Sequence, residues 1–230
     1  MTEINKKFVI ALGGSAICPK EIDTDFLKKF YQFIKKEIKE GKKFIIVTGG
    51  GNTARAYQEA ALKIAKPDDK DKDWIGINAT RINARLLKIL FKKEANPRIF
   101  KERFKIKSFG KFPIIIGSGW QPGWSTDFVT TQIAVDYNIK QVIILGKPEY
   151  VYTADPAKDP NAKPIEKITW ADYQKLIPKK WTPGLHSPVD PVAAKLAAEK
   201  KLEVIVANAK DLDNLKNILN GKNFIGTTLY

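Results

Sequence analysis

The sequence predicts one α/β domain over residues 1–230, a three-layer αβα sandwich with a mainly parallel central sheet. Three observations support this. Short apolar, β-branched runs alternate with longer segments whose apolar residues recur at helical spacing. Several of these runs end in glycine-rich turns, and no internal repeat, linker or low-complexity stretch interrupts the alternation. Ligands in such folds bind beyond the carboxyl ends of the strands.

The first half of the chain is expected to contain three strands and three helices. The helical spacing of Phe26, Phe30 and Ile34 is clear, and Thr24 is a candidate N-cap for their helix. A charged loop is expected between the second and third helices, at 67–72. The strands are expected at 8–12, 44–48 and 113–116, and the helices at 25–39, 53–66 and 74–93.

The second half continues the alternation after one long irregular stretch. Residues 146–167 are dense in Pro, Asp and Lys and are too long for an idle connection, which favours a functional role. Asp190 and Pro191 together form a good helix start. Strands are expected at 141–145, 202–207 and 227–230, and helices at 126–137, 169–177, from Asp190, and at 212–219.

Composition narrows the functional classes. Hydrophobic residues make up 43% of the chain, which excludes general disorder, and no apolar run approaches membrane-spanning length. The polar N-terminus predicts no signal peptide, and the single cysteine, Cys18, fits a reducing compartment such as the cytoplasm. The net charge of +15 suggests nucleic acid, but lysines interleaved with acids indicate a solvated surface instead. The cluster at 101–111 is the best candidate for a basic patch.

Arginine is rare in this lysine-rich chain. Only 5 of the 40 basic residues are arginines, and Arg55, Arg81 and Arg85 lie in two consecutive predicted helices. The planar guanidinium grips phosphate through two hydrogen bonds. For Arg55 this function is favoured over packing, whereas Arg81 and Arg85 fit either role.

The most informative segment is the strand that ends in Gly49, Gly50 and Gly51, followed by a helix with Arg55. Glycines let the backbone approach a ligand closely, and a helix N-terminus favours an anion. Loops at 13–15, 49–52, 117–125 and 146–156 all follow predicted strands. Together they predict a large polyanionic ligand, or two ligands side by side.

Other chemistries lack their residues. The sequence has neither a Walker-type phosphate loop nor a Gly-x-Gly-x-x-Gly after the first strand, and one histidine with one cysteine cannot build a zinc site unaided. Phosphoryl transfer remains, since it needs chiefly positioning, cations and N–H donors. Asp127, at a helix start, could orient a lysine or a metal-bound water, or could simply cap the helix.

An ordered set of motifs resembles the amino acid kinase superfamily, most closely the archaeal-type uridylate (UMP) kinases. These motifs are Gly13-Gly14-Ser15, Gly49-Gly50-Gly51-Asn52-Thr53-Ala54-Arg55, Asp73-Trp74-Ile75-Gly76-Ile77, Thr80-Arg81-Ile82-Asn83-Ala84, Gln121-Pro122-Gly123-Trp124-Ser125-Thr126-Asp127, the segment from Val151 to Pro160, and Asp190-Pro191-Val192-Ala193-Ala194-Lys195.

The resemblance implies an amino acid kinase-like fold and ATP-dependent phosphorylation of UMP with Mg²⁺, in pyrimidine biosynthesis, by a cytoplasmic homohexamer with no nucleic-acid or membrane partner. It implies catalytic roles for Arg55, Asp127 and Gly14, and no protein metal ligand. The implied ATP-binding residues are Ala11, Leu12, Gly13, Gly14, Ser15, Gly51, Arg55, Gly146, Lys147, Tyr152 and Asp155. The implied UMP-binding residues are Gly50, Asp73, Trp120, Gln121, Pro122, Gly123, Trp124, Ser125 and Thr126.

Three departures from the family pattern leave alternatives open. Ala11 stands where many relatives carry a lysine, and residues 146–152 differ from the usual Thr-x-Val-Asp-Gly-Val-Tyr. Trp120 and Trp124 are bulky, so they could stack on the base or reshape the pocket. A catalytically silent nucleotide- or oxyanion-binding member, or a kinase for another small phosphate acceptor, therefore competes with the UMP kinase hypothesis.

Overall fold

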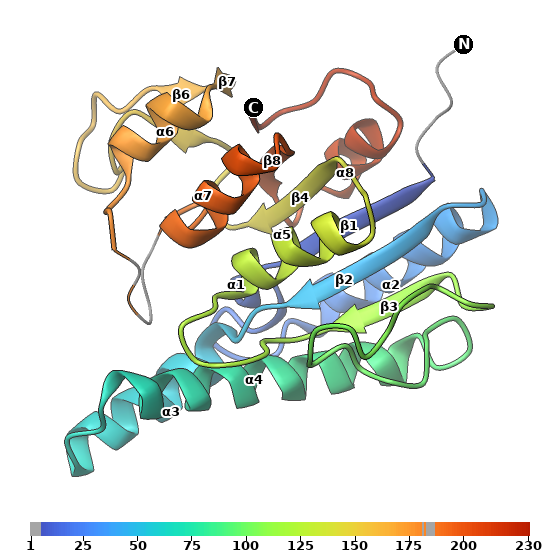
Figure 1. The fold of residues 1–230 in the computed structure, drawn as a ribbon, viewed down its shortest axis with the longest axis horizontal. Helices are drawn as coiled ribbons and strands as arrows, with labels where there is room; N and C mark the ends of the chain where they lie inside the picture. The colour runs from blue at the N-terminus through green and yellow to red at the C-terminus, as the bar shows by residue number, and fades with distance from the viewer. Residues whose placement is uncertain (1–5, 181, 183–186) are drawn as a thin grey trace.

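A seven-stranded sheet runs through the protein in a computed structural model, which describes residues 6–180, 182 and 187–230 (Figure 1). Its first five strands are parallel, and the β9 strand pairs antiparallel with β8, so the mainly parallel prediction is confirmed. The sheet order is β3 (Ile114–Gly117), β2 (Lys43–Thr48), β1 (Lys7–Leu12), β4 (Gln141–Gly146), β8 (Glu203–Asn208), β9 (Thr227–Leu229) and β7 (Lys167–Ile168).

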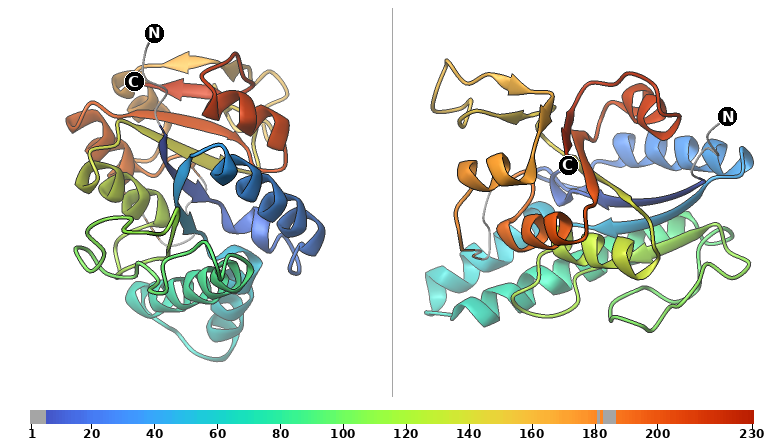
Figure 2. Two further views of the ribbon diagram at one scale, coloured as in Figure 1. Left: turned by 90° about the vertical axis from the view of Figure 1, so that its right-hand side faces the viewer. Right: turned by 45° about the horizontal axis from the view of Figure 1, so that its top comes forward.

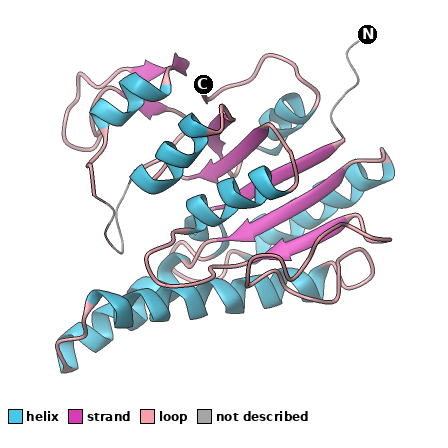
Figure 3. Ribbon diagram, in the orientation of Figure 1, coloured by secondary structure: helices cyan, strands magenta, loops and turns pink. Residues whose placement is uncertain are grey.

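Helices cover both faces of this sheet (Figures 2 and 3). One face packs against α5 (Thr126–Asp136), α6 (Trp170–Leu176) and α7 (Pro191–Glu199). The other face packs against α1 (Gly14–Ile17), α2 (Thr24–Lys39), α4 (Asp69–Leu90) and α8 (Leu212–Leu219). The α3 helix (Gly51–Ile64) lies alongside α4 (Figure 1).

The strands read as continuous apolar runs because both faces are buried. In β1, Val9 and Ala11 enter one core, while Phe8, Ile10 and Leu12 enter the other. This is the side-chain alternation of a strand placed between two helical layers. The αβα prediction is therefore confirmed at the level of individual side chains.

Three local predictions need correction. Asp23, rather than Thr24, caps α2, since its carboxylate accepts the Phe26 N–H. The charged loop expected at 67–72 is largely the first turn of α4, because Asp68 accepts the Asp71 N–H and acidic residues follow in that turn. The irregular stretch at 146–167 contains a short antiparallel hairpin of β5 (Val151–Tyr152) and β6 (Pro164–Ile165).

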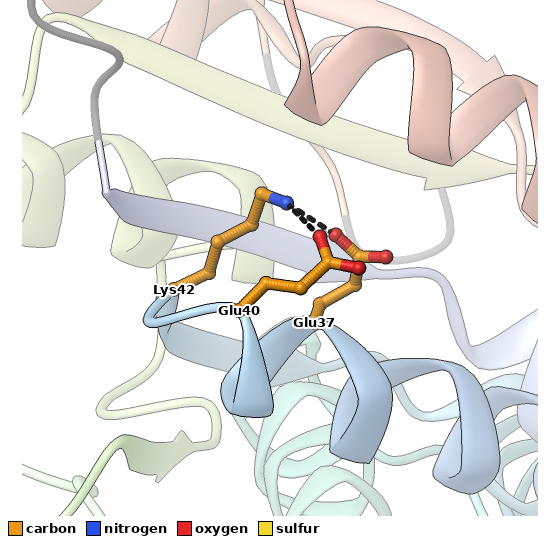
Figure 4. Close-up of polar contacts among 3 residues, drawn as sticks. All are labelled: Glu37, Glu40 and Lys42. Atoms are coloured by element: carbon orange, nitrogen blue, oxygen red, sulfur yellow. Dashed lines mark hydrogen bonds and ion pairs between the residues drawn. The ribbon is translucent and has the colours of Figure 1, made fainter.

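An ion cluster with a buried Lys42–Glu37 pair joins the end of α2 to the start of β2, opposite the carboxyl ends of the strands (Figure 4). The Lys42 ammonium lies 2.5 Å from Glu37 Oε2 and 3.0 Å from Glu40 Oε2. Burial lowers the pKa of Lys42, but its hydrogen bonds to the two carboxylates outweigh burial and raise it overall. Glu37 is fully buried, and its Oε1 has no hydrogen-bond partner among the described residues.

Removing the cation should therefore destabilise the fold. In Lys42→Met, Glu37 would remain buried without its counter-charge, and the free energy of unfolding should fall by about 3 kcal/mol or more. Urea denaturation followed by circular dichroism measures this. The control is Glu40→Gln, whose exposed carboxylate should contribute much less to the free energy of unfolding than the buried pair does. Equal unfolding midpoints for Lys42→Met and the wild type would contradict the prediction.

Candidate functional site

Four loops meet at one edge of the sheet, as the sequence predicts. The strands β3, β2, β1 and β4 are adjacent and parallel, so their carboxyl ends share one side. Leu12 pairs with Thr48 at the end of β1 and β2, and with Leu145 on the other side. The loops that follow these strands therefore start at nearly the same level.

The turns after β1 and β2 are in backbone contact. A Cβ atom placed on Gly14 would lie 1.9 Å from the Gly51 nitrogen, and one on Gly49 would lie 2.4 Å from the Gly14 nitrogen. Gly51 also has a φ of +66°, which other residues rarely adopt. No side chain fits between these turns, and each turn fixes the position of the other.

The two helices that begin at these turns lack a side-chain N-cap. Every other helix of the described residues has a side chain that accepts an N-terminal N–H. The α1 and α3 helices begin after Gly13 and Gly50 with no side-chain cap and no acidic residue in the first turn. In α3, the Asn52 N–H donates to the Cys18 carbonyl at 2.8 Å. Since no side chain caps this helix, the rest of its positive end can face an external anion.

Arg55 lies one turn into α3 and is partly exposed. Its guanidinium makes no hydrogen bond or ion pair with any described residue. An arginine beside an uncapped helix start supplies the planar donors and full charge that bind phosphate. The structure therefore brings together the glycine turn and Arg55, as the sequence predicts.

The α4 helix holds both the glycine turn and the loop after β3. Asn83 Nδ2 donates to the carbonyls of Gly49 and Gly50, at 2.8 and 3.2 Å. Thr80 Oγ1 accepts the Gly119 N–H at 2.8 Å, and Asp73 Oδ2 accepts the Gly123 N–H at 2.6 Å. Burial raises the pKa of Asp73. Sequence reasoning assigned no role to Thr80 or Asn83, although polar residues on the inner face of an amphipathic helix were a usable signal.

The loop after β3 contains a tight turn from Gln121 to Trp124. Gly123 has a φ of +86°, and the Trp124 N–H bonds to the Gln121 carbonyl at 3.3 Å. The indole of Trp120 is only 5% exposed and donates to the Phe100 carbonyl, so little of its ring is accessible for stacking on a base. Trp124 is partly exposed, and its ring packs against Phe128 with centroids 4.9 Å apart.

Asp127 and Asp190 form a carboxyl pair where α5 and α7 begin. The Asp127 carboxyl group lies near the backbone N–H of Asp190, and Ser125 Oγ donates to Asp190 Oδ2. Asp127 keeps some exposed surface, yet dense surrounding protein and the Asp190 charge raise its pKa to about 8. Burial also raises the pKa of Asp190. The sequence identified Asp190 only as a helix cap, a role it also fills through the N–H groups of Val192 and Ala193.

The remaining predicted residues surround the end of β4 or lie within β1. Ala11 and Leu12 are buried in the sheet, so they can offer only backbone atoms to a ligand. Gly146 and Lys147 are held beside the end of β8 through Ala209 and Asn208. Tyr152 on β5 is partly exposed, and Asp155 follows in an exposed loop. No group of three acidic, histidine or cysteine residues converges on a metal site within the described ranges, and His186 lies outside them.

The carboxyl pair makes stability depend on pH. The Asp127 pKa rises from 3.8 when unfolded to about 8 when folded, so the folded state binds more protons between these values. With respect to this carboxyl group, the folded state is therefore most stable at acidic pH. It loses stability as the pH rises towards 8 and Asp127 ionises inside the protein. The thermal unfolding midpoint should therefore fall as the pH rises from about 5 to 8.

In Asp127→Asn this fall should become shallower, because an amide cannot ionise. Asp155→Asn, at an exposed position, should keep the wild-type slope. Differential scanning calorimetry across this pH range measures both variants. A slope unchanged by Asp127→Asn would refute the assignment.

Comparison with known proteins gives concordant results. The model of the amino acid kinase family matches residues 6–208. The chain is 33% identical to the uridylate kinase of Pyrococcus abyssi, over 97% of this chain and 99% of that protein. It is 36% identical to the uridylate kinase of Methanosarcina mazei, over 93% of this chain and 91% of that protein.

A similar solved structure is the uridylate kinase of Archaeoglobus fulgidus, which superimposes with a TM-score of 0.82 and is 24% identical in sequence. The match covers 98% of this chain and all of that chain. This likeness confirms the fold. Since the family model covers most of the chain and curated relatives exceed 30% identity over nearly its full length, the chain belongs to the amino acid kinase family.

Proposed function

We propose that this protein is a uridylate kinase, which transfers the γ-phosphate of ATP to UMP and releases UDP. Similarity to curated uridylate kinases over nearly the full chain supports this activity. The observation that carries it is the contact between two glycine turns beside an unpartnered arginine. Such a junction can hold two phosphate groups close together with little room for water, as in-line transfer requires.

The acceptor is assigned to the side of the junction that α4 organises. Gly50 would approach the UMP phosphate, and the loop from Trp120 to Thr126 would surround the nucleoside. Asp73 Oδ1 makes no hydrogen bond with the described residues, so it can accept a ribose hydroxyl while Oδ2 holds Gly123. Asp73 thus links the sugar to the loop that encloses it.

The donor is assigned to the side formed by β1 and β4. The backbone of residues 11–15 and Gly51 would bind the ATP phosphates. Gly146, Lys147, Tyr152 and Asp155 would frame the base and ribose, since Tyr152 offers a ring and Asp155 a hydroxyl acceptor. The departures from the family pattern at 146–150 fall on this side, so we expect them to affect the choice of donor nucleotide.

Charge at the transfer centre would come from Arg55, N–H donors and a metal ion. Ala11 provides no cation, which increases the demand on Arg55. Of the carboxyl pair, Asp127 fits Mg²⁺, because Mg²⁺ prefers carboxylate oxygens. Both oxygens of Asp190 already accept hydrogen bonds, from Ser125 and from the first turn of α7. When bound with ATP, Mg²⁺ would neutralise phosphate charge. The Gly14 N–H and Arg55 would stabilise charge on the phosphoryl group in flight.

We further propose a cytoplasmic homohexamer acting in pyrimidine biosynthesis, as the family resemblance implies. In the part of the chain that the structure describes, no helix is both long and apolar enough to cross a bilayer. Large apolar side chains are exposed on the paired helices α3 and α4, and such surfaces mark association sites. They are Tyr57, Leu62 and Ile64 on α3, and Trp74, Ile82 and Ile89 on α4.

Arg55→Ala should abolish nearly all UDP formation, by about 10³-fold, because the transferring phosphoryl group loses its main protein cation. A coupled assay with ATP, UMP and Mg²⁺ measures this. Arg55→Lys should recover part of the rate, since it restores the charge without the planar donors. Wild-type protein that binds both nucleotides yet forms no UDP would instead support the silent nucleotide-binding alternative.

The acceptor is tested in the same assay. UMP should be preferred over the other nucleoside monophosphates, isopentenyl phosphate and small carboxylic acids. A higher kcat/KM for any of these would identify a kinase of the same fold with another acceptor.

Self-association should depend on the exposed face of α4. Ile82→Lys combined with Ile89→Lys should lower the oligomeric mass measured by light scattering, because buried lysines would oppose association. The matched control is Leu176→Lys with Ile225→Lys, which changes two comparably exposed residues elsewhere. A monomeric wild type, or an unchanged mass in the α4 variant, would contradict the prediction.

A further inference from the structure

A basic hollow of about 430 Å³ lies between α4 and residues 97–106, beside the edge strand β3. It is distinct from the junction of glycine turns. Its charged lining consists of Arg81, Arg85, Arg98, Lys101, Lys105 and Glu102.

The distribution of arginine singles out this hollow. The chain has five arginines among 40 basic residues. Arg55 lies at the candidate site, and Arg103 forms a bidentate pair with Asp136, at 2.7 and 2.9 Å. All three others line this one hollow, where the tertiary fold brings residues 81 and 85 to residues 98–105. A general basic surface in this chain would be made of lysine.

The positive charge of the hollow is not neutralised by the protein. Its one carboxylate, Glu102, lies 3.6 Å from Lys105. The side chains of Arg85, Arg98 and Lys101 make no ion pair or hydrogen bond with the described residues. Arg81 and Arg85 are one helical turn apart, where like charges repel. A bound anion would relieve this repulsion.

Arg81 connects the hollow to the loop after β3. Its Nη2 donates to the Trp120 carbonyl at 3.3 Å, and its guanidinium carbon lies 5.6 Å from the centre of the Trp74 ring. Its Nε is buried and has no hydrogen-bond partner among the described residues. One donor of Arg81 therefore holds the loop while another remains unsatisfied.

We propose that this hollow is a second anion site, which binds a compact, multiply charged oxyanion such as a di- or triphosphate group. Three guanidinium groups around one concavity match the charge and the planar acceptor geometry of linked phosphates. The small size of this hollow favours a small anion over nucleic acid, which would need an extended basic stripe. Binding there would also alter the Trp120 loop through Arg81, a consequence that rests on the proposed function.

Isothermal titration of the full-length protein with tripolyphosphate, without Mg²⁺, tests the site. Arg85→Gln with Arg98→Gln should weaken binding about tenfold or more, since two charged donors are lost. The matched control, Lys92→Gln with Lys93→Gln, removes the same charge from exposed neighbours outside the hollow and should bind as the wild type does. Arg55→Ala identifies any separate binding at the glycine turns and should leave binding at the hollow intact.

Three results would overturn the proposal. The first is that the wild type binds no tripolyphosphate, and the second is that the arginine and lysine variants bind it equally. The third is that a single-stranded RNA binds through the same arginines more tightly than tripolyphosphate does. A companion assay should show that tripolyphosphate shifts the KM for UMP in the lysine control but not in the arginine variant. Failure of UDP formation would refute the proposed function and leave the titration result standing.

Discussion

The backbone contact between the turns after β1 and β2 is the constraint on which the rest of the site depends. It exists because the two strands pair in parallel with Leu12 opposite Thr48, so both turns leave the sheet at the same height. The separation is so small that only glycine fits at Gly14, Gly49 and Gly51. Two helices therefore start side by side without a side-chain cap. Any side chain here would separate the two halves of the proposed phosphate junction.

The long α4 helix converts this local contact into a complete site. Its buried polar residues bond to the carbonyls of the glycine turn and to N–H groups of the loop after β3, so one rigid element sets the distance between them. The bonds of Asn83 to Gly49 and of Thr80 to Gly119 satisfy backbone groups that burial would otherwise leave unpaired, which explains why a helix inside the protein keeps Thr80 and Asn83. Asp73 adds a carboxylate with one oxygen committed and one free.

The balance of cations and carboxylates differs between three places in the protein, and each balance matches what that place can bind or stabilise. The transfer centre has a protonatable carboxyl pair and one unpartnered arginine, a balance suited to ligands that bring their own charge and metal. The hollow beside β3 has the opposite balance, five cations against one carboxylate. At the far end of the sheet, Lys42 and Glu37 neutralise each other inside the core, where the charges can serve only the fold.

The sequence by itself determined the αβα layers, the order of the six main strands and of helices α2 to α8, and the four loops at one edge. It also placed the glycine triplet next to Arg55. These features are local, because periodicity, glycine turns and helix starts are written in neighbouring residues. Its local errors, the Thr24 cap and the loop at 67–72, arose where several polar residues competed for the same helix start.

Only the tertiary structure decided which distant groups meet. It buried the indole of Trp120, paired Asp127 with Asp190, set Asn83 and Thr80 against the loops, and gathered Arg81 and Arg85 with Arg98. No spacing rule predicts these contacts, since each depends on how a helix packs against the sheet. The sequence thus defined the parts of a phosphate site, and helix packing fixed the charge and the hydrogen bonds around it.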